Sequence, residues 1–154
     1  MREFPGFDGP MFLWQKVEAV DGVAQAISLI RADRTIALAT NSVASQESEI
    51  RQALGRVGLD IYFDNIYCFT KMGIMKPSSR FFDYIVKDLG LLPINLVMVG
   101  DDFEKDIKGA NRCGIYGIWL NENSAERKTG KMYNSINSMA ELPNAIALRE
   151  VMLG

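Results

Sequence analysis

The stretch Val97-Met98-Val99-Gly100-Asp101-Asp102-Phe103-Glu104-Lys105-Asp106 decides the fold of this chain. Three apolar residues predict a buried strand, a glycine ends it, and two carboxylates stand where the backbone turns into a helix. In an open α/β sheet, ligands bind beyond the carboxyl ends of the strands, so these acids face the functional edge. Adjacent carboxylates repel one another, and a hard cation with oxygen ligands, Mg²⁺ before most others, offsets that repulsion. Alternatively, the acids would only interact with the positive N-terminal end of a helix. That explanation accounts for one or two of them but not for the strand, the glycine and the acids together.

Composition bounds the class of protein. The chain has 154 residues, 48% of them hydrophobic, which is enough for the core of one ordinary domain. Its 17 basic and 19 acidic residues give a net charge of −2, and no basic run suggests a nucleic-acid partner. No apolar stretch is long enough to span a membrane, and the N-terminus lacks the layout of a signal peptide. The two cysteines, Cys68 and Cys113, have no metal-type spacing, so we expect buried thiols in a cytoplasmic protein.

The absence of histidine from the sequence narrows the chemistry further. It excludes Ser-His-Asp and Cys-His catalysis, zinc held by histidine, and a histidine general base within this chain. Any chemistry must use carboxylates, lysine, hydroxyl groups or a metal ion.

The apolar pattern alternates between helices and strands. Expected helices cover residues 23–31 (capped by Asp21), 45–57, a segment from Ser78 to Gly90, a segment ending near Arg112, and part of the last twenty residues. Expected strands cover residues 35–40, 66–68, 96–99 and 116–120, and residues 121–131 are expected to form a surface loop. Such alternation predicts an α/β fold, a parallel sheet with helices on both faces. We expect a core domain over residues 21–154, preceded by a separate N-terminal segment, residues 1–20.

Two further features follow the same logic. Thr40, Asn41 and Ser42 end the first expected strand, and such a turn can hold an anionic oxygen, although ordinary turn chemistry also explains it. Lys76 precedes a proline at a helix start, which on its own is unremarkable in a sequence. Together with the acids, these residues would hold a phosphate by Thr40, Asn41 and Lys76, with Mg²⁺ offsetting its charge.

A resemblance to a known family rests on three runs: Ile36-Ala37-Leu38-Ala39-Thr40-Asn41-Ser42, Lys76-Pro77, and Val99-Gly100-Asp101-Asp102 continued by Asp106-Ile107-Lys108-Gly109-Ala110. In order and spacing they resemble the second, third and fourth signature motifs of the haloacid dehalogenase-like (HAD) hydrolases. The resemblance covers about residues 20–142 and favours the phosphatase branch, with its phosphoglycolate-phosphatase-like and nucleotidase-like members.

The resemblance implies a three-layer Rossmann-like core that hydrolyses a small phosphorylated metabolite with Mg²⁺. Thr40 and Lys76 would be catalytic, Thr40 binding the transferring phosphoryl group with Asn41 beside it, and Lys76 neutralising charge. The metal residues that it implies are Asp101, Asp106, which would support the lysine or the metal, and Asp102, the least defined of the three.

One family motif is not found. HAD phosphatases attack phosphorus with an aspartate on the central strand, in the motif Asp-x-Asp-x-Thr, and no such motif precedes Thr40. The nearest string, Gly6-Phe7-Asp8-Gly9-Pro10, has glycine in the nucleophile's place and proline in the threonine's place. Since covalent catalysis needs a nucleophile within reach, we expect an incomplete or inactive phosphatase, a truncated or split form that begins after the nucleophile strand. The rival is a natural non-catalytic module that binds phosphate or metal and acts through a partner.

A receiver-type signalling domain also combines an acidic pair, a threonine and a lysine. In a receiver domain the acids come first in the chain and the lysine comes last. Here the threonine comes first and the acids come last, so the order disfavours the receiver class.

Loss of the central strand would leave two apolar strand edges without partners, at residues 35–40 and 96–99. We expect one of three solutions: residues 11–14 enter as a replacement strand, the two edges pair directly, or a second chain covers them, as in a homo-oligomer. Residues 11–14 could equally be the remnant of a cap helix and its exit.

Overall fold

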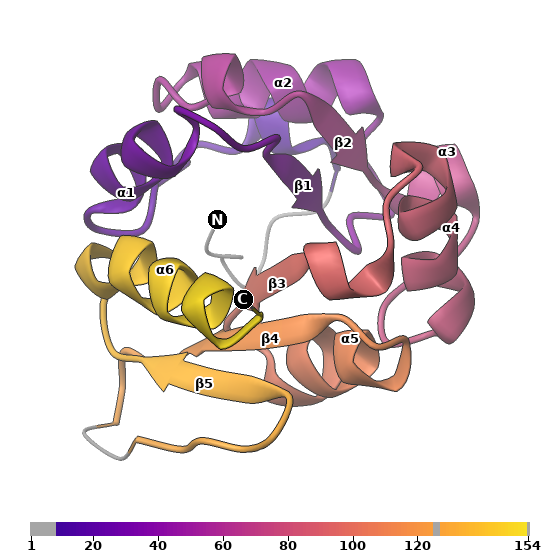
Figure 1. Ribbon diagram of the computed structural model, residues 1–154. Helices are drawn as coiled ribbons and strands as arrows, with labels where there is room; N and C mark the ends of the chain where they lie inside the picture. Colours follow the sequence, from indigo (N-terminus) through magenta and orange to yellow (C-terminus); the bar gives the residue numbers. More distant parts are fainter. Residues whose placement is uncertain (1–8, 125–126, 154) are drawn as a thin grey trace. The chain divides into compact units, whose positions relative to one another are not determined.

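The computed structural model describes residues 9–124 and 127–153. The chain forms two compact units, Met1–Met75 and Lys76–Gly154 (Figure 1). Each unit holds parallel strands flanked by helices, so the predicted α/β class is confirmed. Within the described ranges, no helix is long and apolar enough to cross a membrane. The boundary expected near residue 20 stays a prediction.

The first unit is built on a two-stranded parallel sheet. Its elements are η1 (Met11–Leu13), α1 (Val23–Ile30), β1 (Ala37–Ala39), α2 (Glu47–Gly55), η2 (Asp60–Tyr62), β2 (Asn65–Tyr67) and α3 (Phe69–Met72). Leu38 of β1 lies opposite Ile66 of β2 in the ladder. Glu49 accepts a hydrogen bond from the Gln46 backbone N–H at 2.7 Å, which fixes the start of α2.

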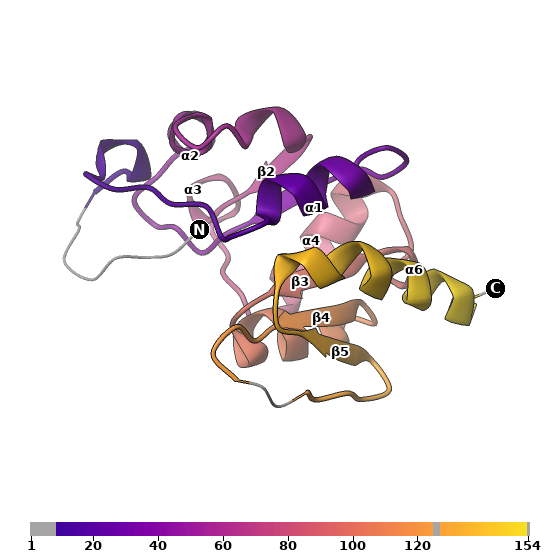
Figure 2. The same cartoon turned by 90° about the vertical axis from the view of Figure 1, so that its left-hand side faces the viewer.

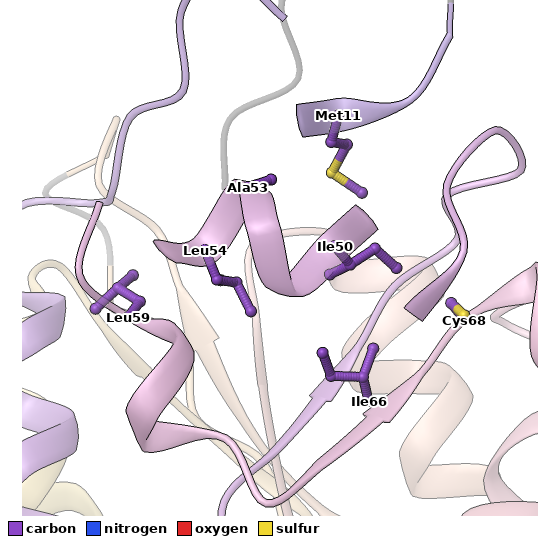
Figure 3. Packing of buried hydrophobic residues seen from close by; sticks show 7 residues of the cluster. All are labelled: Met11, Ile50, Ala53, Leu54, Leu59, Ile66 and Cys68. Atoms are coloured by element: carbon purple, nitrogen blue, oxygen red, sulfur yellow. The ribbon is translucent and has the colours of Figure 1, made fainter. Parts of the chain in front are cut away.

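Helix α2 supplies the core of this unit through its apolar face. Figure 3 shows Ile50, Ala53 and Leu54 on α2, with Met11 on one side of the helix and Ile66 of β2 on the other. The helix expected over residues 45–57 is therefore confirmed over Glu47–Gly55, with Ile50 and Leu54 buried.

The segment at residues 11–14 is not a strand. Residues Met11–Leu13 form a short 3-10 helix, and Met11 is only 6% exposed. Its backbone N–H donates to the buried Ser45 Oγ at 2.9 Å, so a side chain, not a strand neighbour, satisfies that backbone group. The expectation of a replacement strand was wrong because an unbroken apolar run has neither the period of a strand nor that of a helix.

Helix α1 matches the predicted segment but not its predicted cap. Gly22, with φ of 75°, takes the cap position, and no side chain caps the helix there, so the prediction that Asp21 caps it was wrong. The helix is tied to the loop before β2 instead, because Arg31 makes a two-point ion pair with Asp64, both contacts at 2.8 Å.

The second unit contains a three-stranded parallel sheet with strand order β3-β4-β5. Its elements are α4 (Ser79–Leu89), η3 (Pro93–Asn95), β3 (Val97–Gly100), η4 (Phe103–Lys108), α5 (Gly109–Arg112), β4 (Tyr116–Leu120), β5 (Tyr133–Ile136), η5 (Met139–Glu141) and α6 (Leu142–Leu153). The helix expected after β3 begins as a π-helix, η4, and only α5 is α-helical. Strand β5 was not predicted.

Helices cover both faces of this sheet. Arg149 of α6 lies over the Tyr116 ring, 4.5 Å from its centroid, and Figure 2 shows α6 along that face. On the other face, a Cβ on Gly117 would stand 2.6 Å from the Ile107 side chain, so η4 packs directly onto the strand there. Tyr116 and Gly117 are neighbours on β4, and neighbouring side chains point to opposite faces of a strand.

The two sheets are separate over the described residues. β1 and β3 do not pair with each other, so the solution in which the two edges close directly was wrong. β1 is half-buried, and so is β3, which the sequence predicted to be a buried strand. Cys113 is likewise only partly buried, whereas Cys68 is buried as expected. A second chain over the strand edges stays a prediction.

Candidate functional site

The carboxyl end of β3 gathers most of the candidate residues of the second unit. The strand ends at Gly100, Asp101 and Asp102 form the turn, and η4 begins at Phe103. A π-helix is rare and is frequently found at functional sites.

The central contact is a buried ion pair. The ammonium nitrogen of Lys76 lies 2.7 Å from Asp106 Oδ1, and the two side chains are 10% and 6% exposed. Apart from this ion pair, Asp106 Oδ1 accepts no hydrogen bond from the described residues. Asp106 Oδ2 accepts one from the Asp102 backbone N–H at 3.3 Å. A buried charge is tolerated when it is paired in this way, so each partner fixes the other.

Gly100 is what allows Asp106 to lie against the strand end. A Cβ on Gly100 would stand 2.2 Å from Asp106 Oδ2 and 2.6 Å from Asp106 Cγ. The carboxylate therefore occupies the space that any other residue at position 100 would fill.

Lys76 is held in place from the side of its own loop. A Cβ on Gly109, the first residue of α5, would lie 3.1 Å from Pro77 Cβ and 2.8 Å from the Phe82 ring. The absent side chain lets Pro77 and α4 approach α5 closely. The glycine after the acid-rich turn thus has a packing role, and that approach fixes the residue next to Lys76.

Asp102 caps η4. Its Oδ1 accepts the Lys105 backbone N–H at 2.9 Å, and its Oδ2 lies 3.1 Å from the Lys105 ammonium. The hydrogen bond from the Lys105 backbone, with help from the Lys105 side chain, holds the pKa of Asp102 below its ordinary value. Asp102 is therefore charged and already engaged within its own helix.

Asp101 differs from both other acids. It is exposed, and its carboxylate makes no hydrogen bond or ion pair with the described residues. Within residues 9–124 and 127–153, no three acidic, cysteine or histidine side chains lie close enough to share one metal ion. The donors fit a Mg²⁺ ion held by one carboxylate of this unit, since Mg²⁺ commonly keeps several waters and takes further ligands from a phosphate.

Thr40 and Asn41 lie in the first unit, directly after β1. The Thr40 backbone N–H donates to the Tyr67 carbonyl at 2.9 Å, which extends the ladder by one residue. The Thr40 hydroxyl accepts the Ser42 backbone N–H at 3.2 Å and so shapes the turn. Both residues are half-buried, at the carboxyl end of their strand as predicted.

Sequence reasoning missed one contact of this region. The indole nitrogen of Trp119 donates to the backbone carbonyl of Asp101 at 3.0 Å. The only signal in the sequence was the position of Trp119 near the end of an apolar strand, and nothing there indicates that it reaches a neighbouring turn.

The chain is similar in sequence to a family of known proteins. The family model of the haloacid dehalogenase-like hydrolases matches residues 6–114. The pyrimidine 5′-nucleotidase of Escherichia coli is 33% identical over 110 residues, which cover 71% of this chain and 48% of that protein. The chain thus spans about half the length of that relative.

Two solved structures are similar as well. An uncharacterized protein from Listeria monocytogenes has a TM-score of 0.80 at 25% identity, covering 92% of this chain and 86% of that one. A HAD phosphatase from Thermococcus onnurineus has a TM-score of 0.66 at 26% identity, covering 79% and 55%. Because the family model matches well over half of the sequence, the chain belongs to the haloacid dehalogenase-like hydrolases.

Proposed function

We propose that this chain carries the charge-neutralising part of a Mg²⁺-dependent phosphate monoester hydrolase. The observation that carries the proposal is the buried Lys76–Asp106 ion pair at the end of β3, the strand that Asp101 follows with an exposed carboxylate. A fixed cation and a free hard ligand at one strand end are the two components that a phosphate and its metal ion require.

Each residue has a distinct task in this proposal. Lys76 places a positive charge where a phosphoryl oxygen gains negative charge, and Asp106 holds that ammonium group in position. Asp101 supplies one oxygen ligand to Mg²⁺, which when bound withdraws charge from the phosphoryl oxygens. Thr40 and Asn41 remain proposed phosphate ligands of the first unit.

The substrate class is a small phosphorylated metabolite. Support comes from relatives named as a pyrimidine 5′-nucleotidase and as glyceraldehyde 3-phosphate phosphatases, the latter 27% identical in Methanothermobacter thermautotrophicus. Because no Asp-x-Asp motif is found in the sequence, we propose that the chain binds metal and phosphate but does not turn substrate over by itself. A non-catalytic module that acts through a partner is the second candidate, favoured by the same missing motif.

The experiment is a calorimetric titration of Mg²⁺ into the whole chain in the presence of inorganic phosphate. We expect weak binding that Asp101→Asn removes, because that substitution takes away the open carboxylate. Asp88→Asn, which removes an exposed acid from α4, is the matched control and should bind as the unmodified chain does. Equal heats for the chain and for Asp101→Asn would refute the site.

A further inference from the structure

We propose that Trp119 is a positioning residue for Asp101. Its indole N–H holds the backbone of the turn and thereby sets the direction in which the Asp101 carboxylate meets a cation. The inference rests on the proposed function, because it concerns the same acid.

The register of the sheet places Trp119 next to the turn. Gly100, the last residue of β3, lies opposite Trp119 in the parallel ladder, and Asp101 follows directly. Trp119 shares the face of Gly117, on which η4 lies, because side chains two residues apart point the same way. Its indole therefore lies on the face of the sheet over which the turn passes, and Nε1 meets the Asp101 carbonyl at 3.0 Å.

Neighbouring rings keep the indole in this position. The Phe103 ring lies 5.0 Å from the Trp119 ring at an angle of 53°, and the Tyr133 ring packs edge-on against Phe103 at 5.1 Å. Phe103 is the first residue of η4 and Tyr133 the first of β5, so the cluster links helix, β4 and β5. A partly buried indole takes a hydrogen-bond partner for its N–H, and here that partner is the turn.

The remaining contacts of the turn show why this bond matters for Asp101. On the helix side, the Asp102 backbone N–H is held by Asp106, and the Asp102 carboxylate by Lys105. The Asp101 carboxylate has no partner among the described residues, so its direction depends on its own backbone. The Trp119 bond fixes that backbone at Asp101 itself.

The test uses Trp119→Phe, which keeps an aromatic ring beside Phe103 but removes the N–H. Without metal, we expect amide hydrogen exchange at residues 101–105 to become about five- to tenfold faster, as for the loss of one hydrogen bond. The affinity for Mg²⁺ should fall by a similar factor. Trp14→Phe is the matched control, because Trp14 donates its indole N–H to the Gly9 carbonyl in the first unit, and it should change neither quantity.

A measurement on the unmodified chain covers the case in which Trp119→Phe does not fold. The sequence has two tryptophans, so an indole-labelled ¹⁵N spectrum shows two cross-peaks, which Trp14→Phe assigns. Addition of Mg²⁺ should shift the Trp119 peak and leave the Trp14 peak in place, and Asp101→Asn should abolish the shift.

The outcomes separate this inference from the proposed function. If Mg²⁺ binds through Asp101 while the Trp119 peak does not move, Trp119 does not position the acid. The same conclusion follows if Trp119→Phe has the amide exchange rates and the Mg²⁺ affinity of the unmodified chain. If Mg²⁺ does not bind at all, the proposed function fails, and the metal-free exchange rates at residues 101–105 still decide whether Trp119 holds the turn.

Discussion

Lys76 and Asp106 show that a buried charge depends on its partner. Both side chains are almost inaccessible to water, so removal of one leaves the other charged, desolvated and unpaired. We expect Lys76→Met to lower the free energy of unfolding by about 3–5 kcal/mol, a typical loss when a buried pair is broken. Chemical denaturation of the chain and the variant measures it.

The double variant Lys76→Met with Asp106→Asn is the control for this prediction. Asparagine can still accept the Asp102 backbone N–H but carries no charge, so more than half of the lost stability should return. A double variant less stable than Lys76→Met alone would show that the charge pairing is not what holds this part of the unit.

Gly100 allows a second prediction for a single residue. A Cβ there would overlap the Asp106 carboxylate, so Gly100→Ala must displace the acid or the strand end. Overpacking of this kind costs about 1–3 kcal/mol, which thermal or chemical unfolding detects.

Gly55→Ala provides a matched control for that substitution. Gly55 is the last residue of α2. A Cβ added there would lie 3.8 Å from Asp60 Cγ, which is an ordinary van der Waals contact. Since alanine favours a helix more than glycine does, this variant should be neutral or slightly stabilising. Equal losses for the two variants would mean that the contact with Asp106 is not the cause.

At the scale of elements, one ion pair makes the stability of the fold depend on pH. It joins Arg31, directly after α1, to Asp64, directly before β2. The hydrogen bonds from Arg31, together with one from the Ile36 backbone, lower the pKa of Asp64 below its ordinary value. A carboxyl group whose folded-state pKa is lowered stabilises the fold above its ordinary pKa, about 4, and loses that contribution as the pH falls through the lowered value.

We therefore expect the stability of the chain to fall between about pH 5 and pH 2, and to fall less steeply in Asp64→Asn. The two free energies of unfolding should converge at the acid end of a series of denaturant titrations. Parallel curves over that range would show that Asp64 keeps its ordinary pKa.

The elements that the sequence predicted well share one property: the apolar residues within each element determine which of its faces is buried. The β4 strand at Tyr116–Leu120 is apolar and follows a glycine turn, and α4 has a clear stripe in Phe81, Phe82 and Ile85. The β5 strand was missed because its centre is polar. Ser135 is buried, but its hydroxyl accepts the Lys128 backbone N–H, a contact that no local pattern reveals.

The residues and contacts of the site also differ in how well the sequence predicted them. The acids after β3 were found because strand, glycine and carboxylates are adjacent in sequence. The pairing of Lys76 with Asp106 joins positions thirty residues apart. It was predicted only through the resemblance to a family, which implied that Asp106 supports either the lysine or the metal. The Trp119 bond to Asp101 was not predictable, because it depends on register across two strands.

At the scale of the whole molecule, β1 and β3 are each the outer strand of a sheet in the part of the chain that the structure describes. Among residues 9–124 and 127–153, β3 pairs with one strand, β4, and its residues, all apolar except for the glycine at its end, are half-buried. Natural proteins protect such edges by charge, by a covering element or by another chain. Of the three solutions considered from the sequence, the second chain is the one that remains as a prediction.

The missing motif gives the last prediction. Without a carboxylate in the nucleophile's place, the purified chain should hydrolyse a generic aryl phosphate with Mg²⁺ no faster than Asp101→Ala does. Release of the aryl alcohol, followed by absorbance over hours, measures the rate. Robust activity that disappears in Asp101→Ala or in Lys76→Met would mean that another carboxylate serves, with Glu18 and Asp8 as candidates; Asp8 lies outside the described residues.

The close approaches at Gly100, Gly109 and Gly117 bear on how variation in this family should be interpreted. Each space that a methyl group would need is taken by a different side chain, on Asp106, Phe82 and Ile107. In a library of single variants selected for folding alone, these three positions would reject nearly every replacement, whereas exposed Asp101 would accept many. Only a selection for phosphate or metal binding would make Asp101 intolerant, so the contrast between the two selections, more than invariance itself, separates chemistry from architecture here.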